Sequence, residues 1–523
     1  KDGNIHFMLN EQFRDAKQLV RYREFTEEMV QLILEADGSL KAEHGTGRIM
    51  APFVRRQFGD ELFEVMREIK RLIDPKGFLN PGVVLAEEDT DYATDLKVAE
   101  TVEEEVDRCV ECGYCEPVCP SKDLTLTPRQ RIVLRREIAA AEANGDTKLA
   151  ERLRQEYEYY GVDTCAVDGM CVTRCPVLIN TGDLVRRLRA ENQDALGAAG
   201  WKFASKHWGA VDKVAGKALT VAKMLPFPVV RGATDIGRKL FGEDMVPAYK
   251  KGLSAGGAPR VPHTEATPEI VFFPACVNAM FGGVDGGGKH DPVNATQAFI
   301  RLCERAGVKY RVPEGIDQMC CGTPWKSKGY TDGYSIMSDR VLKALWQATD
   351  GGRIPIVCDA SSCTEGLEVM RAKVAAAVEH KITQGLGAGE ADYAQLKLID
   401  SVQFAADTLL PKLTVSAPLP SLALHPTCSM THLGVQPAFE KIANAMSDQV
   451  YVPKNWGCCG YAGDRGMLHP ELTQSATRAE TAELNEHEFA AYASSNRTCE
   501  QGMTEATGHT FQNVLQLLER ATR

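Results

Sequence analysis

The sequence predicts a multidomain protein in which α/β domains accompany a mainly helical domain. The chain has 523 residues, whereas one hydrophobic core rarely serves more than about 250–300 residues. Its 17 cysteines fall in tight clusters, separated by long stretches without cysteine. A short apolar strand pattern that ends in cysteine occurs twice in the C-terminal half, and a Cys-Cys-Gly sequence follows each copy. This duplication predicts two similar α/β modules.

The overall composition excludes several classes of function. The net charge is −11, whereas nucleic-acid binding calls for a basic surface, so no nucleic-acid partner is expected. No apolar run reaches the roughly 18–20 residues of a membrane-spanning helix. The chain begins at Lys1, within what reads as a motif, and shows no signal peptide. We therefore expect a cytoplasmic location and a further N-terminal portion before Lys1.

The clustered cysteines admit two interpretations. A framework of disulfides is typical of short secreted chains and fits an odd number of cysteines poorly. Metal ligation is typical of cysteine clusters in a long chain without a signal peptide. The sequence therefore favours thiolates that bind metal in a reducing compartment.

The first 86 residues have the pattern of the end of an α/β domain. Six apolar residues recur at helical spacing and predict a helix with one apolar face. This helix should end at Asp74, because the residue before a proline is disfavoured in the α conformation. Residues 87–107 carry ten acidic side chains against one lysine, Lys97, which predicts an extended, solvated linker. The apolar residues of the expected helix are Leu62, Val65, Met66, Ile69, Leu72 and Ile73.

Residues 108–195 carry the first seven cysteines and are expected to form a helical domain with two iron–sulfur clusters. The first group has the spacing C-x2-C-x2-C-x3-C-P of bacterial ferredoxins, in which three thiolates bind one cluster and the fourth binds the other. Zinc sites usually use two separated C-x2-C pairs instead. The four cysteines of this group are Cys109, Cys112, Cys115 and Cys119, followed by Pro120.

The second group repeats this spacing with an aspartate in place of its second cysteine. By the crossed rule, one cluster is held by Cys109, Cys112, Cys115 and Cys175, and the other by Cys119, Cys165 and Cys171. Asp168 is the candidate fourth ligand of the latter cluster. A carboxylate is a harder ligand than a thiolate, so this cluster should be labile, either an Asp-ligated 4Fe-4S or a 3Fe-4S cluster. The alternative is that Asp168 caps a turn and a cysteine from elsewhere completes the site.

Residues 196–262 contain no cysteine and form a basic connector. From Trp201 to Arg260 there are eleven Lys or Arg residues and four Asp or Glu residues. Two interpretations stay open. The segment packs on neighbouring domains with its lysines solvated, or it lies on the inner face of the cell membrane as a basic amphipathic helix. The lysines and apolar residues of the latter interpretation are Lys202, Lys206, Lys213, Lys217 and Lys223, with Trp201, Phe203, Trp208, Val211, Val214, Leu219 and Val221.

Residues 263–410 and 411–523 are the two expected cysteine-rich modules, here called module 1 and module 2. Module 1 offers Cys276, Cys320, Cys321, Cys358 and Cys363, and module 2 offers Cys428, Cys458, Cys459 and Cys499. Adjacent cysteines are strained for a disulfide but well placed to bind one polynuclear centre, and the glycine that follows lets the backbone approach the metal.

The two modules resemble the cysteine-rich domain of heterodisulfide reductases and of iron–sulfur subunits of related dehydrogenases. The resemblance implies a further iron–sulfur cluster in module 1 and leaves one in module 2 open. The family pattern ends in C-x2-C, whereas module 1 has Cys358-x4-Cys363 and module 2 has only Cys499. Cys303 lies in a helical pattern and is expected to be a buried core thiol. His425 is either a ligand or a structural histidine.

Three short motifs near the start of the chain belong together. They are Asp2-Gly-Asn-Ile-His6, Glu43-His-Gly-Thr-Gly47 and Asp74-Pro-Lys-Gly-Phe-Leu-Asn-Pro-Gly82. In this order and spacing they resemble the C-terminal domain of FAD-linked 2-hydroxyacid oxidases related to vanillyl-alcohol oxidase. The resemblance implies that His6 and Glu43 bind a divalent metal (Zn or Mn), that His44 is the general base on the substrate hydroxyl, and that Asn80 contacts the FAD.

Together these features predict an FAD- and iron–sulfur-dependent D-2-hydroxyacid dehydrogenase. D-2-hydroxyglutarate is the favoured substrate, followed by D-lactate and glycolate, and a quinone or a redox protein is the expected acceptor. One alternative is a non-catalytic electron-transfer subunit that docks onto a separate flavoprotein. Another is a thiol–disulfide reductase that uses the Cys-Cys-Gly region. The sequence leaves the oligomeric state open.

Overall fold

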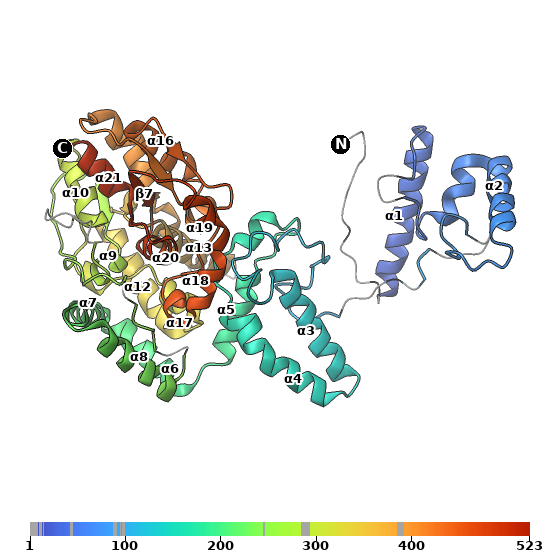
Figure 1. Cartoon of the computed structure of the whole chain (residues 1–523), viewed down its shortest axis with the longest axis horizontal. Coiled ribbons are helices and arrows are strands. Elements are labelled where there is room, and N and C mark those ends of the chain that lie inside the picture. Colours follow the sequence, from blue (N-terminus) through green and yellow to red (C-terminus); the bar gives the residue numbers. More distant parts are fainter. Residues whose placement is uncertain are drawn as a thin grey trace. The chain divides into compact units, whose positions relative to one another are not determined.

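The computed structural model describes residues 9, 13, 15–41, 45–86, 92–94, 96, 100–243, 246–250, 252–283, 293–383 and 392–523 (Figure 1). The chain divides into two compact units, Lys1–Cys112 and Gly113–Arg523. Among the described helices, none combines the length and the apolar character needed to cross a membrane.

The first unit contains α1 (Ala16–Glu35) and α2 (Val54–Ile73), and a short 3-10 helix, η1 (Ala51–Phe53), precedes α2. Helix α2 is kinked at Gly59, whose φ is +77°. The helix predicted from the apolar spacing is confirmed and ends at Asp74. The Asp74 carboxylate accepts hydrogen bonds from the backbone N–H groups of Phe78 and Leu79 and from Lys70. The hydrogen bond from Lys70 is the main reason why the pKa of Asp74 is lowered. The apolar face of α2 is largely exposed, with Leu72 83% accessible.

The acidic segment 87–107 is only partly the solvated linker that the sequence predicted. Tyr92 donates a hydrogen bond to the carbonyl of Arg23 at 3.2 Å, and its ring packs against Tyr22 and Phe53. Val106 is fully buried. The expectation of full solvation is wrong at these positions, because burial of a few apolar side chains outweighs the repulsion among the neighbouring carboxylates.

The second unit begins with the helical domain expected between the two cysteine groups. A capping box at Thr127 and a proline at the first position start α3, which satisfies free backbone N–H groups at that end. A π-helical turn then leads to the second cysteine group, which contains a 3-10 helix. The elements are α3 (Pro128–Ala143), α4 (Thr147–Tyr157), η2 (Glu158–Asp163), η3 (Met170–Arg174) and α5 (Thr181–Glu191).

The basic connector forms three helices, α6 (Ala195–Lys206), α7 (Trp208–Met224) and α8 (Phe227–Phe241). Trp208 is buried and its ring packs on Trp325 of module 1, as does the ring of Trp201. The expectation that these two aromatic rings lie on a membrane-facing side is therefore wrong. Large indole rings find more apolar contact in the core of module 1 than at the surface.

The two modules have the same sheet topology. Each contains a four-stranded parallel sheet, with strand order β2-β1-β3-β4 in module 1 and β6-β5-β7-β8 in module 2. The predicted duplication is thus present in the fold. The strands are β1 (Ile270–Phe273), β2 (Tyr310–Arg311), β3 (Ile356–Cys358), β4 (Leu398–Asp400), β5 (Leu422–Leu424), β6 (Val450–Tyr451), β7 (Ala491–Ser494) and β8 (Phe511–Asn513).

Two helix contacts, which are equivalent by the duplication, join the modules. Helix α10 of module 1 packs on α21 of module 2, and α14 of module 1 packs on α16 of module 2. One hydrophobic core, with Phe272, Phe299 and Leu424 among its members, runs through both modules. The principal helices are α9 (Cys276–Met280), α10 (Ala295–Arg305), α11 (Thr323–Lys328), α12 (Thr331–Ala348), α13 (Ser361–Thr383) and α14 (Ser401–Phe404) in module 1, and α15 (Cys428–Leu433), α16 (Gln436–Met446), α17 (Arg465–Leu468), α18 (Pro470–Ala476), α19 (Arg478–Leu484), α20 (Arg497–Thr507) and α21 (Val514–Ala521) in module 2.

Short 3-10 and π-helical turns complete module 1. They are η4 (Ile316–Gln318), η5 (Tyr393–Gln395), η6 (Ala405–Leu409) and η7 (Leu410–Lys412).

Candidate iron–sulfur sites

One cavity of the helical domain brings together the residues predicted to hold the second cluster. Its lining includes Cys119, Cys165, Cys171 and Asp168. The Cys119 loop precedes α3, Cys165 follows η2, and Cys171 lies in η3. Oxygen Oδ2 of Asp168 is buried and, within the described residues, has no hydrogen-bond partner. Three thiols and an unsatisfied carboxylate oxygen around one cavity suit the ligand set of an iron–sulfur cluster.

A buried arginine that sequence reasoning missed lies at the same cavity. Arg131 of α3 is 1% exposed, and it donates hydrogen bonds to the carbonyl of Gly161 and to the Ser121 hydroxyl at 2.7 and 2.9 Å. Its third nitrogen is 3.7 Å from the Cys119 sulfur. The guanidinium thus offers positive charge to the thiolates of a bound cluster. No local sequence pattern predicts the burial of Arg131, because an arginine in a helix is usually exposed.

Electrostatics at this cavity favour protonated ligands in the absence of bound metal. Burial raises the pKa of the Cys119 thiol, although Arg131 opposes the shift. Burial also raises the pKa of Cys171 to about 12 and raises the pKa of Asp168. Metal ligands must be deprotonated, so cluster binding at these residues releases protons.

Asp168 also contacts module 2. The thiol of Cys458 is a hydrogen-bond partner of the Asp168 carboxylate, and Cys458 packs with Ala166 and Met170 of the helical domain. A cysteine from elsewhere thus lies beside the site, as the alternative interpretation of Asp168 requires. The cavity itself, however, is lined by Asp168. This geometry favours Asp168 as the fourth ligand, which stays a prediction.

The other predicted ligand set is divided between the two units. Cys109 and Cys112 belong to the first unit, whereas Cys115 and Cys175 belong to the second. Their joint role in one cluster stays a prediction.

Module 1 gathers its five predicted thiols beyond the carboxyl ends of β1 and β3. The Cys276 and Cys320 sulfurs are 3.5 Å apart. Cys321 interacts with the thiols of both Cys320 and Cys363, and Cys363 also interacts with Cys358. All five cysteines are buried and free of disulfides among the described residues. Parallel strands place the residues that follow them at one sheet edge, which brings these distant cysteines together.

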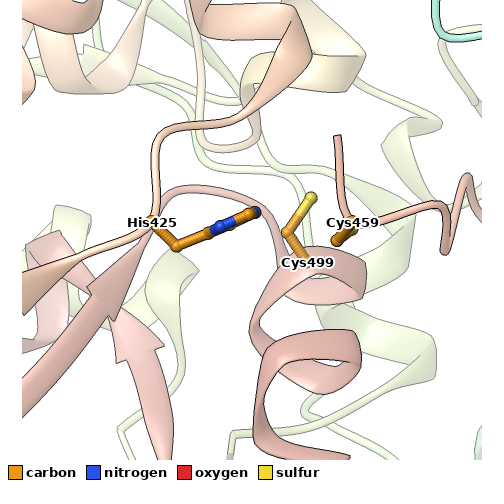
Figure 2. Close-up of side chains that lie close together, drawn as sticks. All are labelled: His425, Cys459 and Cys499. Carbon is orange, nitrogen blue, oxygen red and sulfur yellow. The ribbon is translucent and has the colours of Figure 1, made fainter. Parts of the chain in front are cut away.

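Module 2 repeats this arrangement with one difference. Cys428 interacts with Cys458, and Cys459 interacts with Cys499. The donor atoms of His425, Cys459 and Cys499 all lie within 4.8 Å of one another (Figure 2). The sequence left open whether His425 is a ligand or structural, and the structure places its imidazole at the thiols.

The same pattern of pKa shifts recurs in the two modules. Hydrogen bonds from Cys320 and Cys363 lower the pKa of Cys321. A hydrogen bond from Cys499 likewise lowers the pKa of Cys459. Burial opposes the protonation of His425, but the Glu480 carboxylate and the Cys459 thiol outweigh burial and raise its pKa to about 10. Each Cys-Cys pair thus contains one thiol that ionises readily, as a metal ligand must.

The glycine of each Cys-Cys-Gly sequence has a backbone role. Gly322 and Gly460 adopt φ values of +80° and +69°. A Cβ atom on Gly322 would lie 2.7 Å from the Tyr334 ring, and one on Gly460 would lie 3.1 Å from Leu472. These glycines are therefore required by the left-handed turn and the packing behind it, in addition to any close approach to a metal.

The remaining predicted site residues have separate outcomes. Cys303 is fully buried in the hydrophobic core, which confirms the core thiol. Asn80 is exposed, with a positive φ of 43°. His6, Glu43 and His44 lie outside the described residues, and their roles stay predictions.

Three protein families match successive parts of the chain. Residues 1–84 match the C-terminal domain of FAD linked oxidases, residues 105–179 match the 4Fe-4S dicluster domain, and residues 270–368 and 422–504 match the cysteine-rich domain.

Curated relatives match parts of the chain. A probable mitochondrial D-lactate dehydrogenase of Danio rerio is 34% identical over 84 residues, which is 16% of this chain and 17% of the relative. The D-2-hydroxyglutarate dehydrogenases of Haemophilus influenzae and Escherichia coli are 25% and 24% identical over 217 and 226 residues. These matches cover 32% and 33% of this chain, and 21% and 22% of the relatives.

The chain thus spans about a fifth, or less, of the length of these relatives. The three family matches follow one another in the order predicted from the motifs. The chain therefore combines the C-terminal domain of FAD-linked oxidases with a 4Fe-4S dicluster domain and a duplicated cysteine-rich domain.

Proposed function

We propose that the chain takes part in the oxidation of a D-2-hydroxyacid to the 2-oxoacid at FAD, and that iron–sulfur clusters carry the electrons to a quinone or a redox protein. The contact between Asp168 and Cys458 carries this proposal, because it joins the candidate cluster site of the dicluster domain to that of module 2. Two ligand sets that share a buried contact provide a short path for single electrons. When bound, FAD would accept two electrons from the substrate and release them one at a time.

D-2-hydroxyglutarate is the favoured substrate. The dehydrogenases of this name match over 217 and 226 residues, whereas the D-lactate dehydrogenase of Danio rerio matches over 84. The longer matches extend beyond the 84 residues of the oxidase domain. D-lactate and glycolate follow in that order.

The protein groups proposed for the substrate step lie in the first 86 residues. His44 takes the proton of the substrate hydroxyl. His6 and Glu43 would hold a divalent metal, which would polarise the substrate oxygens. Asn80 contacts the FAD. A His44→Ala variant should slow flavin reduction by roughly two to four orders of magnitude, the usual contribution of a general base. Glu43→Ala should also lose the divalent metal.

The rival functions are separated by direct measurements on the purified protein or its complex. Steady-state oxidation of D-2-hydroxyglutarate, D-lactate and glycolate with a quinone analogue tests the main proposal, together with the visible flavin spectrum. A complex that has iron–sulfur absorbance but no flavin spectrum supports the non-catalytic subunit. Reduction of a disulfide substrate in place of hydroxyacid oxidation supports the thiol reductase.

Asp168 marks the labile cluster in this proposal. Asp168→Cys should convert a 3Fe-4S electron paramagnetic resonance signal into a stable 4Fe-4S signal, because a thiolate binds iron more tightly than a carboxylate. Cys303→Ser is the matched control, since this thiol belongs to the core and no cluster change is expected. Two air-stable 4Fe-4S clusters in the wild-type dicluster domain would contradict the assignment.

We also propose a peripheral contact of the connector with an anionic membrane surface, which suits electron delivery to a quinone. Helices α7 and α8 expose an apolar row flanked by the accessible Lys217 and Lys239. Two of the lysines named from the sequence are instead paired with module 1, Lys202 with Asp332 and Lys213 with Asp317. The exposed apolar residues are Val214, Val221, Met224, Val229, Ile236 and Leu240.

Co-sedimentation with vesicles tests this contact. Binding should require anionic lipid, weaken with salt, and fall about ten-fold or more when Lys217 and Lys239 become glutamine, because each lysine contributes about 1 kcal/mol. Lys202→Gln should leave binding unchanged, since Lys202 is paired with Asp332. Equal recovery in the supernatant with and without anionic vesicles supports the connector interpretation.

A further inference from the structure

Module 2 lacks a thiol at the position of Cys358 in module 1. In module 1, Phe272 pairs with Val357 and Phe273 with Cys358. In module 2, Leu424 pairs with Ala493 in the same register. The next pair is therefore His425 and Ser494, and the bond from the His425 N–H to the Ala493 carbonyl continues the ladder. The Ser494 hydroxyl donates a hydrogen bond to the His425 carbonyl at 3.0 Å.

The imidazole of His425 takes up the space beside the remaining thiols. A ring nitrogen of His425 and the sulfurs of Cys459 and Cys499 lie within 4.8 Å of one another, and all three side chains are buried (Figure 2). In module 1 the corresponding neighbour of Cys363 is the Cys358 thiol. An imidazole nitrogen thus stands where the equivalent site has a sulfur.

A buried carboxylate fixes the orientation of this ring. Nδ1 of His425 is 2.8 Å from Oε1 of Glu480, and the Glu480 side chain is 2% exposed. A carboxylate on one ring nitrogen is the usual support of a histidine that binds metal through the other nitrogen. Helix α19, which carries Glu480, therefore positions the ring with Nε2 directed at the thiols.

A purely structural histidine accounts less well for these contacts. Because Nδ1 is bonded to Glu480, the buried Nε2 has only the Cys459 thiol as its neighbouring polar group among the described residues. A thiol is a weak hydrogen-bond partner, whereas a bond to metal would satisfy Nε2 fully. Module 1 has Phe273 at the equivalent strand position, so the fold does not require an imidazole there.

We propose that module 2 holds an iron–sulfur centre of mixed ligation, in which His425 Nε2 replaces the thiolate that Cys358 supplies in module 1. The other ligands are Cys428, Cys458, Cys459 and Cys499. This inference rests on the proposed function, in which the modules carry iron–sulfur clusters. A neutral imidazole brings one negative charge fewer than a thiolate, and histidine in place of cysteine raises the potential of an iron–sulfur centre. The centre of module 2 is then the better electron acceptor of the two.

Pulsed electron paramagnetic resonance of the full chain, reconstituted with iron and sulfide and labelled with ¹⁵N-histidine, tests the ligand directly. We expect a strong histidine nitrogen coupling that disappears in His425→Phe, a change that reproduces the residue of module 1. The matched control is His487→Phe, an exposed histidine of the same module, which should retain the coupling. Survival of the coupling in His425→Phe with module 2 iron retained overturns the inference.

Two further variants keep the test decisive if His425→Phe folds poorly. His425→Cys should keep iron, lose the nitrogen coupling and lower the reduction potential of the centre. Glu480→Gln should keep both iron and coupling and shift the potential. An unchanged potential in His425→Cys contradicts the inference.

The iron content separates this inference from the proposed function. Unchanged iron in Cys459→Ser means that module 2 binds no cluster, and both then fail. Loss of iron in Cys459→Ser, together with a coupling that does not depend on His425, overturns the histidine ligand alone.

Discussion

Modules 1 and 2 have the same sheet topology and contribute to one hydrophobic core. They differ in the residues at one pair of neighbouring strand positions. Module 1 has Phe273 and Cys358 there, and module 2 has His425 and Ser494. The phenylalanine fills space while its strand partner supplies sulfur. In module 2 the roles are exchanged, since the imidazole reaches the thiols and the serine hydroxyl bonds to the backbone. The two modules thus keep the same strand register but place different side chains at this pair of positions.

The environments of the two sites differ as well. The module 1 thiols are surrounded by their own module, with Thr323 as the partner of Cys321. The Cys458 thiol of module 2 contacts Asp168 of the dicluster domain, and Gly169 lies against the His432 ring. Among the described residues, module 2 is therefore in direct contact with the candidate cluster site, which suits the higher reduction potential proposed for its centre.

The largest expected effect is the separate loss of each centre. Cys321→Ser should remove the iron of module 1, and Cys459→Ser that of module 2, because each of these thiols interacts with the neighbouring ligands of its set. Iron and sulfide per chain measure both losses, with Cys303→Ser as the control that retains full content. Loss of all iron from both modules in either variant would show that the centres are not independent.

A core substitution tests whether the modules unfold together. Phe272→Ala removes a buried ring that packs 4.7 Å from the Phe299 ring and should cost about 3–5 kcal/mol, and Leu424→Ala about 2–5 kcal/mol. Because one core runs through both modules, each variant should lower the same thermal transition in calorimetry. Two transitions, each sensitive to only one variant, would mean that the modules unfold independently.

The two helix contacts between the modules should differ in strength. Glu519 of α21 is 2% exposed and pairs with Arg305 of α10 at 3.1 Å. Glu519→Gln should cost about 1.5–3 kcal/mol, the contribution of hydrogen bonds to a charged group. Thermal unfolding at neutral pH, with the wild type as reference, gives this difference.

The Glu519 contribution also has a defined pH dependence. Burial opposes ionisation of Glu519, but hydrogen bonds from Arg523 and Arg305 outweigh it and lower its pKa. A lowered carboxyl pKa stabilises the fold above the unfolded value of about 4.3, and this stability is lost as the pH falls through the folded pKa. The difference between wild type and Glu519→Gln should therefore shrink below about pH 4.3. A constant difference at all pH values would contradict this account.

The smallest effect is expected at an ion pair between η6 of module 1 and α16 of module 2. Asp407 and Lys441 form an ion pair at 3.2 Å, and both side chains are 53% exposed. Exposed pairs contribute about 0–1 kcal/mol and are screened by salt. Asp407→Asn should therefore shift the thermal midpoint by no more than a few degrees at low salt. A loss as large as that of Glu519→Gln would make the two contacts equivalent.

Several features were determined by the sequence alone, because they depend on residues close together in the chain. The end of α2 at Asp74 follows from Pro75, and the capped start of α3 follows from Thr127 and Pro128. The ferredoxin spacing identified the dicluster domain, since one cluster dictates the spacing of its ligands. The repeated strand and Cys-Cys-Gly patterns predicted two similar α/β modules.

Other features were decided by tertiary structure. His425 meets Cys459 and Cys499 only because parallel strands gather distant residues at one sheet edge. Arg131 is buried beside Cys119, where the Gly161 carbonyl and the Ser121 hydroxyl accept its hydrogen bonds. Trp208 turns into module 1, because packing of its ring outweighs the preference of the basic connector for solvent. The sequence predicted Asp168 as an unusual ligand from its position, but its contact with Cys458 joins residues whose proximity no local pattern encodes. The sequence shows which side chains are able to bind a metal. Which of these side chains lie close enough to bind the same metal centre depends on long-range packing.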